Sequence, residues 1–286
     1  GRFCPPWQHG DGAMCGMGGS FGASLARGAE PMLGALRHRG PDGEGVWRDP
    51  ANRAVLVHAR LAILDLSPAG TQPMGCEAVA GRPAHSWLAC NGEIYNFREL
   101  RAELEARGET FLGQSDTEVV LRLLEREGAA ALHRLAGMFA LAWFDARTGR
   151  ALLARDPFGI KPLYVSEAGG RLMFASQVKA LTASGLVPLE PDPAGHAGFY
   201  QWGSVPEPYT LYRTIRAFPA GSWAVYRPGM PLTPRRYFSL RDEALAAKER
   251  ARPVSSSEAR ERLTQAMRST MTAHLVSDVP VGVFLS

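Results

Sequence analysis

The stretch MFALAWFDARTGRALLA, residues 138–154, carries the clearest secondary-structure pattern in this 286-residue chain. Two apolar runs, residues 138–144 and 152–154, flank a turn at Thr148-Gly149. Apolar runs joined by a short Gly-containing turn are typical of a β-hairpin. A second such pattern follows, with strands expected at 163–165 and 172–175 around Gly169-Gly170.

Shorter apolar segments on both sides predict more strands, separated by a few amphipathic helices. A layered α+β fold is therefore expected. Further strands are predicted within 15–25 and at 46–47, 54–58, 61–66 and 86–89, and helices at 31–38, 97–107, 115–128 and 255–275. The helix from Ser115 begins with a capping-box pattern, because Glu118 follows three residues later.

Composition excludes several classes of protein. The hydrophobic fraction is 45% and the charged fraction 21%, as in an ordinary soluble globular protein. The sequence contains no run of about 18 apolar residues, so no membrane span is predicted. The net charge of +4 comes without a basic stripe, so no nucleic-acid partner is expected. Four cysteines without metal-ligand spacing predict a reduced cytoplasmic protein with no metal site.

The two ends of the chain suggest a cut sequence. Residues 1–14 precede Cys15 without periodicity, either as a leader or as an over-extended gene start, and the second interpretation is favoured. The last residues, 281–286, form an apolar run expected to be a buried strand, so the chain is expected to be a fragment. Three segments follow: the extension 1–14, a domain over 15–204, and a linker with the beginning of another domain over 205–286.

Cys15 is the first candidate for chemistry. A cysteine at the amino terminus has a free α-amine with a pKa near about 8. That amine can serve as the base for the residue's own thiol. The alternative is a small buried core cysteine.

Four short polar sites stand out. His38-Arg39-Gly40-Pro41-Asp42 is an unusual turn that combines a cation and an anion, and its structural interpretation is a surface turn with a salt bridge. Arg60 is either an edge-strand arginine or a partner for a carboxylate. Asn91-Gly92 is most simply a hairpin turn, but these residue types also form oxyanion holes. Asp116 either interacts favourably with the dipole of its helix or, together with Glu93, binds an ammonium group. Together these residues suit an amino-acid substrate.

Longer motifs place the chain in a family. It resembles the glutamine-hydrolysing asparagine synthetases, specifically their N-terminal class II glutaminase domain. The matching stretches include Met14-Cys15-Gly16, HRGPDGEG from His38, HARLAILDLSPAGTQPM from His58, CNGEIYNFREL from Cys90, SDTEVVL from Ser115, LAGMFALAWFD from Leu135 and LLARDPFGIKPLYV from Leu152. They cover roughly residues 14–286 in one order.

The resemblance implies a fold and a set of roles. The fold is a four-layer αββα sandwich of the N-terminal-nucleophile hydrolase type, followed by the start of an α/β ATP-pyrophosphatase domain. Cys15 is then the nucleophile, and Asn91 and Gly92 are the oxyanion donors. Glutamine is held by Arg60, Asn91, Glu93 and Asp116, and Leu285 lies at the start of the ATP site.

The same resemblance implies an enzyme that hydrolyses glutamine and passes the ammonia to a second site. There ATP, with Mg, would activate aspartate as its β-aspartyl adenylate, and ammonia would convert this adenylate to asparagine. The enzyme would be a cytoplasmic ligase. It could also form a homodimer. One alternative is an amidotransferase with another acceptor, in exopolysaccharide or peptide modification. Sugar-phosphate and phosphoribosyl amidotransferases are disfavoured by DVPVGVFLS from Asp278. Another alternative is a non-catalytic binding protein with the same fold.

Three departures from the family pattern bear on function. The loss of everything after Ser286 is expected to remove nearly all of the ATP and aspartate site. Residues 1–14, if retained, would block the α-amine of Cys15. Gln177 stands where the family motif Phe-Ala-Ser usually continues with Glu.

Overall fold

The structure, a computed structural model, describes residues 14–22, 27–76 and 84–280. The strands are β1 (Gly16–Phe21), β2 (Gly43–Arg48), β3 (Ala54–Arg60), β4 (Met74–Gly75), β5 (Ser86–Ile94), β6 (Gly137–Asp145), β7 (Arg150–Arg155), β8 (Tyr164–Ala168), β9 (Arg171–Ala175), β10 (Arg216–Ala217), β11 (Ser222–Tyr226) and β12 (Arg235–Arg236). The α-helices are α1 (Ala29–Leu36), α2 (Phe97–Ala106), α3 (Asp116–Glu127), α4 (Val178–Ala183), α5 (Pro193–Trp202), α6 (Leu240–Glu249) and α7 (Ser256–His274).

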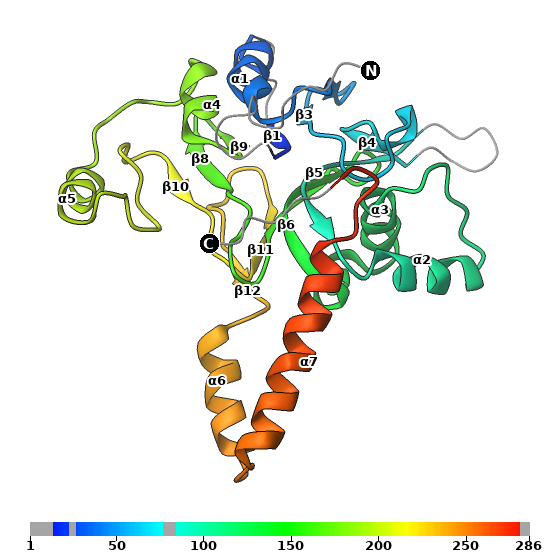
Figure 1. The fold of residues 1–286 in the computed structure, drawn as a ribbon. Helices are drawn as coiled ribbons and strands as arrows, with labels where there is room; N and C mark the ends of the chain where they lie inside the picture. The colour runs from blue at the N-terminus through cyan, green and yellow to red at the C-terminus, as the bar shows by residue number, and fades with distance from the viewer. Residues whose placement is uncertain (1–13, 23–26, 77–83, 281–286) are drawn as a thin grey trace, which may run out of the picture.

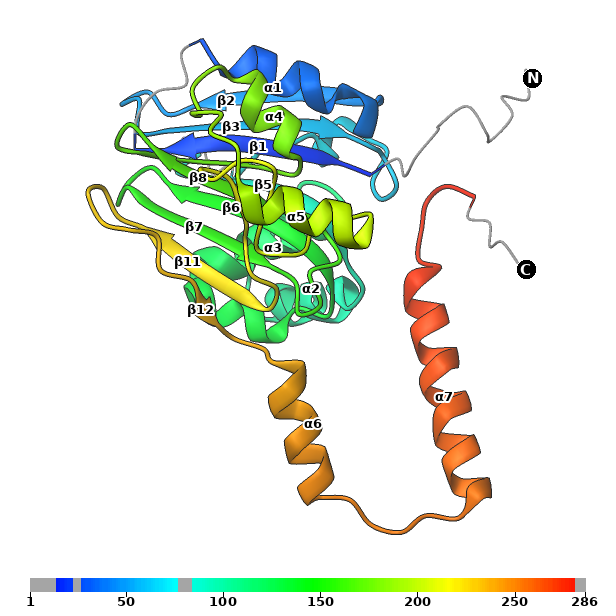
Figure 2. The same ribbon diagram turned by 90° about the vertical axis from the view of Figure 1, so that its left-hand side faces the viewer.

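Two six-stranded antiparallel sheets pack face to face. Their strand orders are β10-β8-β9-β1-β3-β2 and β12-β11-β7-β6-β5-β4. Helices α1 and α4 cover the outer face of the first sheet, and α2 and α3 cover the outer face of the second (Figure 1, Figure 2). The described chain is therefore a four-layer αββα sandwich, as the resemblance implied.

The sequence of β6 is almost continuously apolar because both faces of the strand are buried. Side chains alternate between the two faces of a strand. Ala140, Ala142 and Phe144 enter the core between the sheets, whereas Phe139, Leu141 and Trp143 enter the core under α2 and α3. Both faces of the strand are covered, so neither face can be polar.

Most predicted elements are confirmed within a few residues. Both hairpins form, as β6 with β7 and β8 with β9, and the predicted helices correspond to α1, α2, α3 and α7. The long helix α7 begins after Ser255, whose hydroxyl accepts from the Glu258 amide at 3.1 Å. The strand expected at 281–286, the extension 1–13 and Leu285 lie outside the described residues.

Two local predictions are wrong. The segment 61–66 is a loop, because β3 ends at Arg60 and the backbone of Ile63 and Asp65 bonds to Asp278 rather than to a neighbouring strand. Asn91-Gly92 is not a hairpin turn; it lies inside β5, paired with β6. The long β6 partner outweighs the local turn preference of Asn-Gly.

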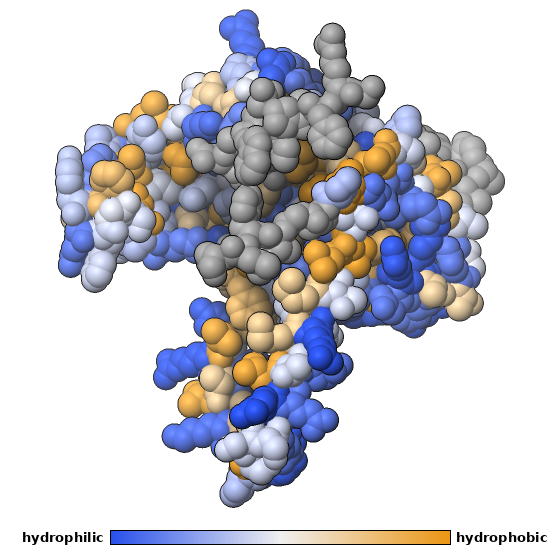
Figure 3. All heavy atoms as spheres, in the orientation of Figure 1, coloured by the Kyte–Doolittle hydropathy of each residue, from blue (hydrophilic) through white to orange (hydrophobic). Residues whose placement is uncertain are grey.

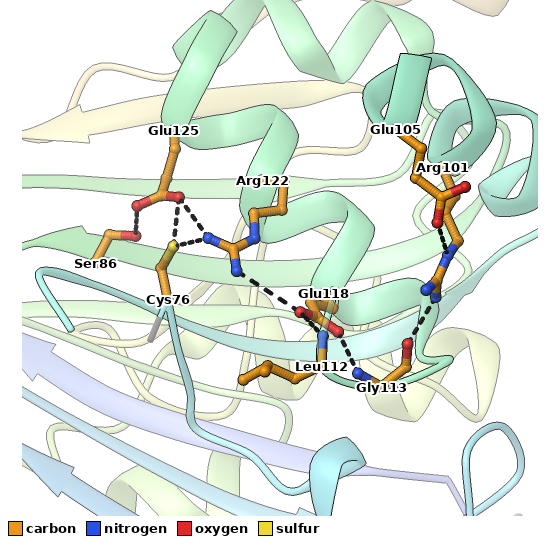
Figure 4. A network of polar contacts seen from close by, with 9 residues as sticks. All are labelled: Cys76, Ser86, Arg101, Glu105, Leu112, Gly113, Glu118, Arg122 and Glu125. Carbon is orange, nitrogen blue, oxygen red and sulfur yellow. Dashed lines mark hydrogen bonds and ion pairs between the residues drawn. The ribbon is translucent and has the colours of Figure 1, made fainter. Parts of the chain in front are cut away.

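A polar network holds α3 in place (Figure 4). Ser115 caps the helix, accepting from the Thr117 amide at 3.0 Å. The capping box is only half formed, since the Glu118 carboxylate accepts from the amides of Leu112 and Gly113 instead, both at 2.9 Å. One turn on, Arg122 lies 3.8 Å from Glu118. These contacts set the position of the first turn of α3, which carries Asp116.

Residues beyond 204 contribute to both sheets. Strand β10 pairs with β8, and β11 pairs with β7 along five residues. Helices α6 and α7 then extend away from the sandwich (Figure 2). In the described part of the chain, no helix is both long enough and apolar enough to cross a membrane.

Candidate active site

One pocket, with about 570 Å³ of empty space, brings the predicted residues together. Its walls come from the start of β1, the end of β3, the end of β5 and the start of α3. Among its lining residues are Cys15, Arg60, Asn91, Gly92, Glu93 and Asp116. Every candidate from the sequence that the structure describes therefore lines a single cavity, although these residues are up to 101 positions apart (116 − 15).

The Cys15 thiol lies against a backbone segment rather than a side-chain base. Its Sγ is 3.4 Å from the Leu61 amide nitrogen and 3.5 Å from the Leu61 carbonyl oxygen. Burial raises the pKa of the Cys15 thiol, while the Leu61 hydrogen bond and the charge of Lys161 oppose that rise. The thiol therefore needs a base to become a thiolate near neutral pH.

Asn91 and Gly92 present unused hydrogen-bond donors on β5. Within the described part of the chain, neither polar atom of the buried Asn91 side chain has a partner. Gly92 is paired with Phe139, whose own backbone groups both bond to Asp156 on the far side of β6. In an antiparallel ladder this makes a non-hydrogen-bonded pair, so the Gly92 N–H points away from β6.

The glycine at position 92 is required by close packing. A Cβ there would lie 2.5 Å from the Met138 carbonyl oxygen and 2.8 Å from the Phe139 backbone. The β5 edge to which Gly92 N–H points is also the edge where Cys90 N–H donates to Gln72, at 2.7 Å. Asn91 and Gly92 can thus offer two donors to a developing oxyanion.

Two carboxylates make one wall of the pocket strongly acidic. Asp116 is buried, and burial raises its pKa although the Ile94 amide donates to it at 2.8 Å. Burial and the charge of Asp116 together raise the pKa of Glu93. Two carboxylates held near each other favour an ammonium ligand, because that ligand stabilises both ionised forms.

Arg60, at the end of β3, lines the same pocket. Its guanidinium donates to the backbone carbonyls of Asp65 and Ser67, the latter at 3.1 Å. These bonds orient the fork while other donors remain available for a carboxylate. A pocket with one cationic and one acidic wall matches the charges of an amino acid.

Two cationic residues near Cys15 were not assigned a role from the sequence. Lys161 lines the pocket, with its Nζ 3.0 Å from Met14 Sδ. Arg39 is buried and donates through Nε to the Cys15 carbonyl at 3.1 Å. Both lie within motifs quoted above, HRGPDGEG and LLARDPFGIKPLYV, yet only the fold brings them close to Cys15.

Other polar or reactive residues lie outside this constellation. Cys90 is fully buried, and burial raises its pKa well above the ordinary value. Burial lowers the pKa of His58 to about 4, so it stays neutral and bonds to the Cys90 carbonyl. Gln177 precedes α4 and is not among the pocket residues. In the described ranges, no group of three or more His, Cys, Asp or Glu residues is arranged to hold a metal ion.

Comparison with known proteins gives this constellation a context. Residues 14–238 match the family described as a glutamine amidotransferase domain. The chain is 35% identical over 282 residues to asparagine synthetase [glutamine-hydrolyzing] 1 of Bacillus subtilis, covering 96% of this chain and 42% of the relative. It is likewise 35% identical to asparagine synthetase B of Escherichia coli, with the same shares. The chain thus spans less than half the length of these relatives.

The fold also has counterparts among solved structures. The glutamine phosphoribosylpyrophosphate amidotransferase of B. subtilis superposes with a TM-score of 0.59 at 21% sequence identity. The match covers 79% of this chain and 50% of that one. The likeness concerns the fold, which both chains share as an α+β sandwich.

Proposed function

We infer that Cys15 is the nucleophile of a glutamine-hydrolysing site, because the chain belongs to the glutamine amidotransferase domain family. One observation carries the inference: the Cys15 thiol shares a pocket with the free donors of Asn91 and with the acidic pair Glu93 and Asp116. This arrangement suits an amino acid whose carboxamide faces the thiol.

Binding would use the opposed charges of the pocket. The α-carboxylate of glutamine would accept from Arg60, and its α-ammonium would lie between Glu93 and Asp116. Burial raises the pKa of both carboxylates, and the charge of Asp116 adds to the rise at Glu93, so a bound ammonium would stabilise their ionised forms. Orientation of this kind presents the γ-carboxamide to Cys15 and lowers the entropic cost of the attack.

The reaction would proceed through a thioester. The α-amine of Cys15, once free, takes the thiol proton, and the thiolate attacks Cδ, the carbonyl carbon of the γ-carboxamide. The carbonyl π electrons move to oxygen, and this oxyanion accepts from Asn91 and Gly92. Collapse of the tetrahedral adduct breaks the C–N bond, and the α-ammonium of Cys15 supplies the proton that lets ammonia leave. Water then cleaves the thioester, giving glutamate and the free thiol.

For the whole protein, we propose glutamine-dependent synthesis of asparagine. The support is the 35% identity to glutamine-hydrolysing asparagine synthetases over nearly all of this chain. Ammonia would pass to a synthetase domain that follows the glutaminase domain, where ATP and Mg would activate aspartate. An amidotransferase with another acceptor is the second candidate. A cytoplasmic location and a homodimer are also proposed.

Two measurements test these proposals separately. A chain that begins at Cys15 should release glutamate and ammonia in equal amounts from glutamine, and rapid quenching should trap a γ-glutamyl adduct on Cys15 by intact mass. Failure of both would contradict the glutaminase. The whole protein should form asparagine from aspartate, ATP and glutamine; glutamine hydrolysis without asparagine would favour another acceptor.

A further inference from the structure

Helix α7 stands away from the sandwich for most of its length. It has no buried residue, and Leu263, Met267 and Met271 are exposed along it. Figure 3 shows hydrophobic residues mixed with charged ones over α6 and α7. The carboxyl end of α7 nevertheless returns to the sandwich beside α3 and β5 (Figure 1).

The first contact of this end is with the loop of residues 61–67. Asp278 Oδ2 accepts from the Asp65 amide at 2.8 Å, and the Asp278 amide donates to the Ile63 carbonyl at 3.0 Å. The two bonds run in opposite directions between the same two short segments. They add to the bonds that Asp42 and Gln114 make with the same loop, so Asp278 is one of the residues that hold its position.

This loop also holds two groups of the candidate active site. Leu61 contacts the Cys15 thiol through both its backbone polar groups. The carbonyls of Asp65 and Ser67 accept from Arg60. A shift of the loop would therefore move the partners of both the thiol and the guanidinium.

The second contact is on the other side of the pocket. His274, the last residue of α7, lies with its Nε2 2.9 Å from the Tyr95 hydroxyl, and the two rings are 4.5 Å apart between centroids. Tyr95 follows β5 directly and is two residues beyond Glu93. The carboxyl end of α7 therefore joins the Arg60 side of the pocket to the Glu93 side.

We propose that residues 274–278 form a clasp that positions the glutamine pocket, so that glutamine affinity depends on whether the end of α7 is docked. The proposal rests on the proposed glutaminase function. The clasp lies between a helix that has few contacts with the sandwich and the loop that holds Arg60. Movement of α7 would thus be communicated to glutamine binding, and Asp278 is a positioning residue.

Substitutions at Asp278 test this proposal. Asp278→Ala removes the acceptor for the Asp65 amide, and Asp278→Asn keeps an acceptor oxygen of the same reach. Loss of a single hydrogen bond corresponds to about a five- to tenfold effect. We expect Asp278→Ala to raise the KM for glutamine by about that factor with kcat little changed, and Asp278→Asn to restore most of the affinity. Glu261→Ala, on an exposed part of α7, is the matched control and should leave KM unchanged.

Amide hydrogen exchange supplies a readout that does not need activity. In the 286-residue chain, Asp278→Ala should accelerate exchange in peptides covering residues 61–67, whereas Glu261→Ala should not. An active wild-type chain whose KM is unaffected by Asp278→Ala overturns the clasp. If the wild-type chain that begins at Cys15 releases no glutamate, the glutaminase proposal fails instead. The clasp is then tested by amide hydrogen exchange alone. It is overturned if Asp278→Ala leaves the exchange rates of residues 61–67 unchanged.

Discussion

The Cys15 thiol sits between the amide nitrogen and the carbonyl oxygen of Leu61, at 3.4 and 3.5 Å. These backbone groups orient the sulfur, but neither can remove its proton. Burial meanwhile raises the pKa of the thiol. The relationship defines what the site needs for catalysis, namely a base close to Cys15 and a positive charge that stabilises the thiolate.

Cys15→Ala should abolish glutamine hydrolysis. No thioester can form without the sulfur, and removal of a catalytic nucleophile typically costs more than about 10³-fold in rate. Cys90→Ala is the matched control, since Cys90 is fully buried with a strongly raised pKa and should keep most of the activity. Glutamate release is the assay. Substantial activity in Cys15→Ala would contradict the assigned nucleophile.

The free α-amine of Cys15 should be essential. In the chain as printed, Met14 acylates that nitrogen, and an amide nitrogen is not basic. Met14 also lines the pocket, against Lys161. A chain that retains residues 1–14 should keep at most about a few per cent of the activity, since little thiolate then exists at pH 7. Intact mass must confirm each amino terminus. Equal rates from the long form and the form starting at Cys15 would exclude the amine as the base.

Lys161→Met should move the pH profile of hydrolysis. The charge of Lys161 lowers the pKa of the Cys15 thiol, so its removal should raise that pKa. The acidic limb of kcat/KM for glutamine should therefore shift to higher pH. Lys179→Met, at an exposed lysine of α4, serves as the control. A profile that stays in place while activity falls would point to a role of Lys161 in binding.

Asp116→Asn should increase stability while it weakens glutamine binding. Burial raises the pKa of Asp116, so the folded chain binds more protons than the unfolded chain above the usual Asp pKa of about 4. Stability contributed by this group is therefore lost as pH rises from there through the folded pKa. The melting temperature of the Asn variant relative to wild type should rise between pH 4 and pH 8, measured without glutamine.

Asp192→Asn provides a control of opposite sign. Some burial acts against it, but the hydrogen bonds from Arg216 and Ala194 lower the pKa of Asp192. Its contribution to stability is therefore present above the usual Asp pKa and lost as pH falls.

Glutamine added to the Cys15→Ala background should raise the melting temperature, and the additional Asp116→Asn change should largely remove that rise. An identical rise in both would show that Asp116 does not contact the substrate.

Much of the fold follows from local patterns. The runs in 138–154 specify a hairpin because their residues favour extended structure and the Thr148-Gly149 turn reverses the chain. Ser115 likewise predicts where α3 begins, since its side chain can cap the first turn. The same local rules fail at residues 61–66 and at Asn91-Gly92. Their conformation depends on Asp278 and on β6, which are distant in the sequence.

The sequence by itself determined the residue types of the site: a cysteine with a potential free amine, an arginine, an Asn-Gly pair and two acids, in an order typical of one family. Only the tertiary structure decided that these residues share one pocket, that Lys161 also lines it, that Arg39 bonds to the Cys15 carbonyl, and that the end of α7 contacts the loop of residues 61–67. The physical reason is the separation in sequence between the residues that interact. Helix caps and turns depend on neighbours a few residues away, whereas desolvation, charge pairing and the direction of the Gly92 N–H arise only when the two sheets pack and the strands pair in register.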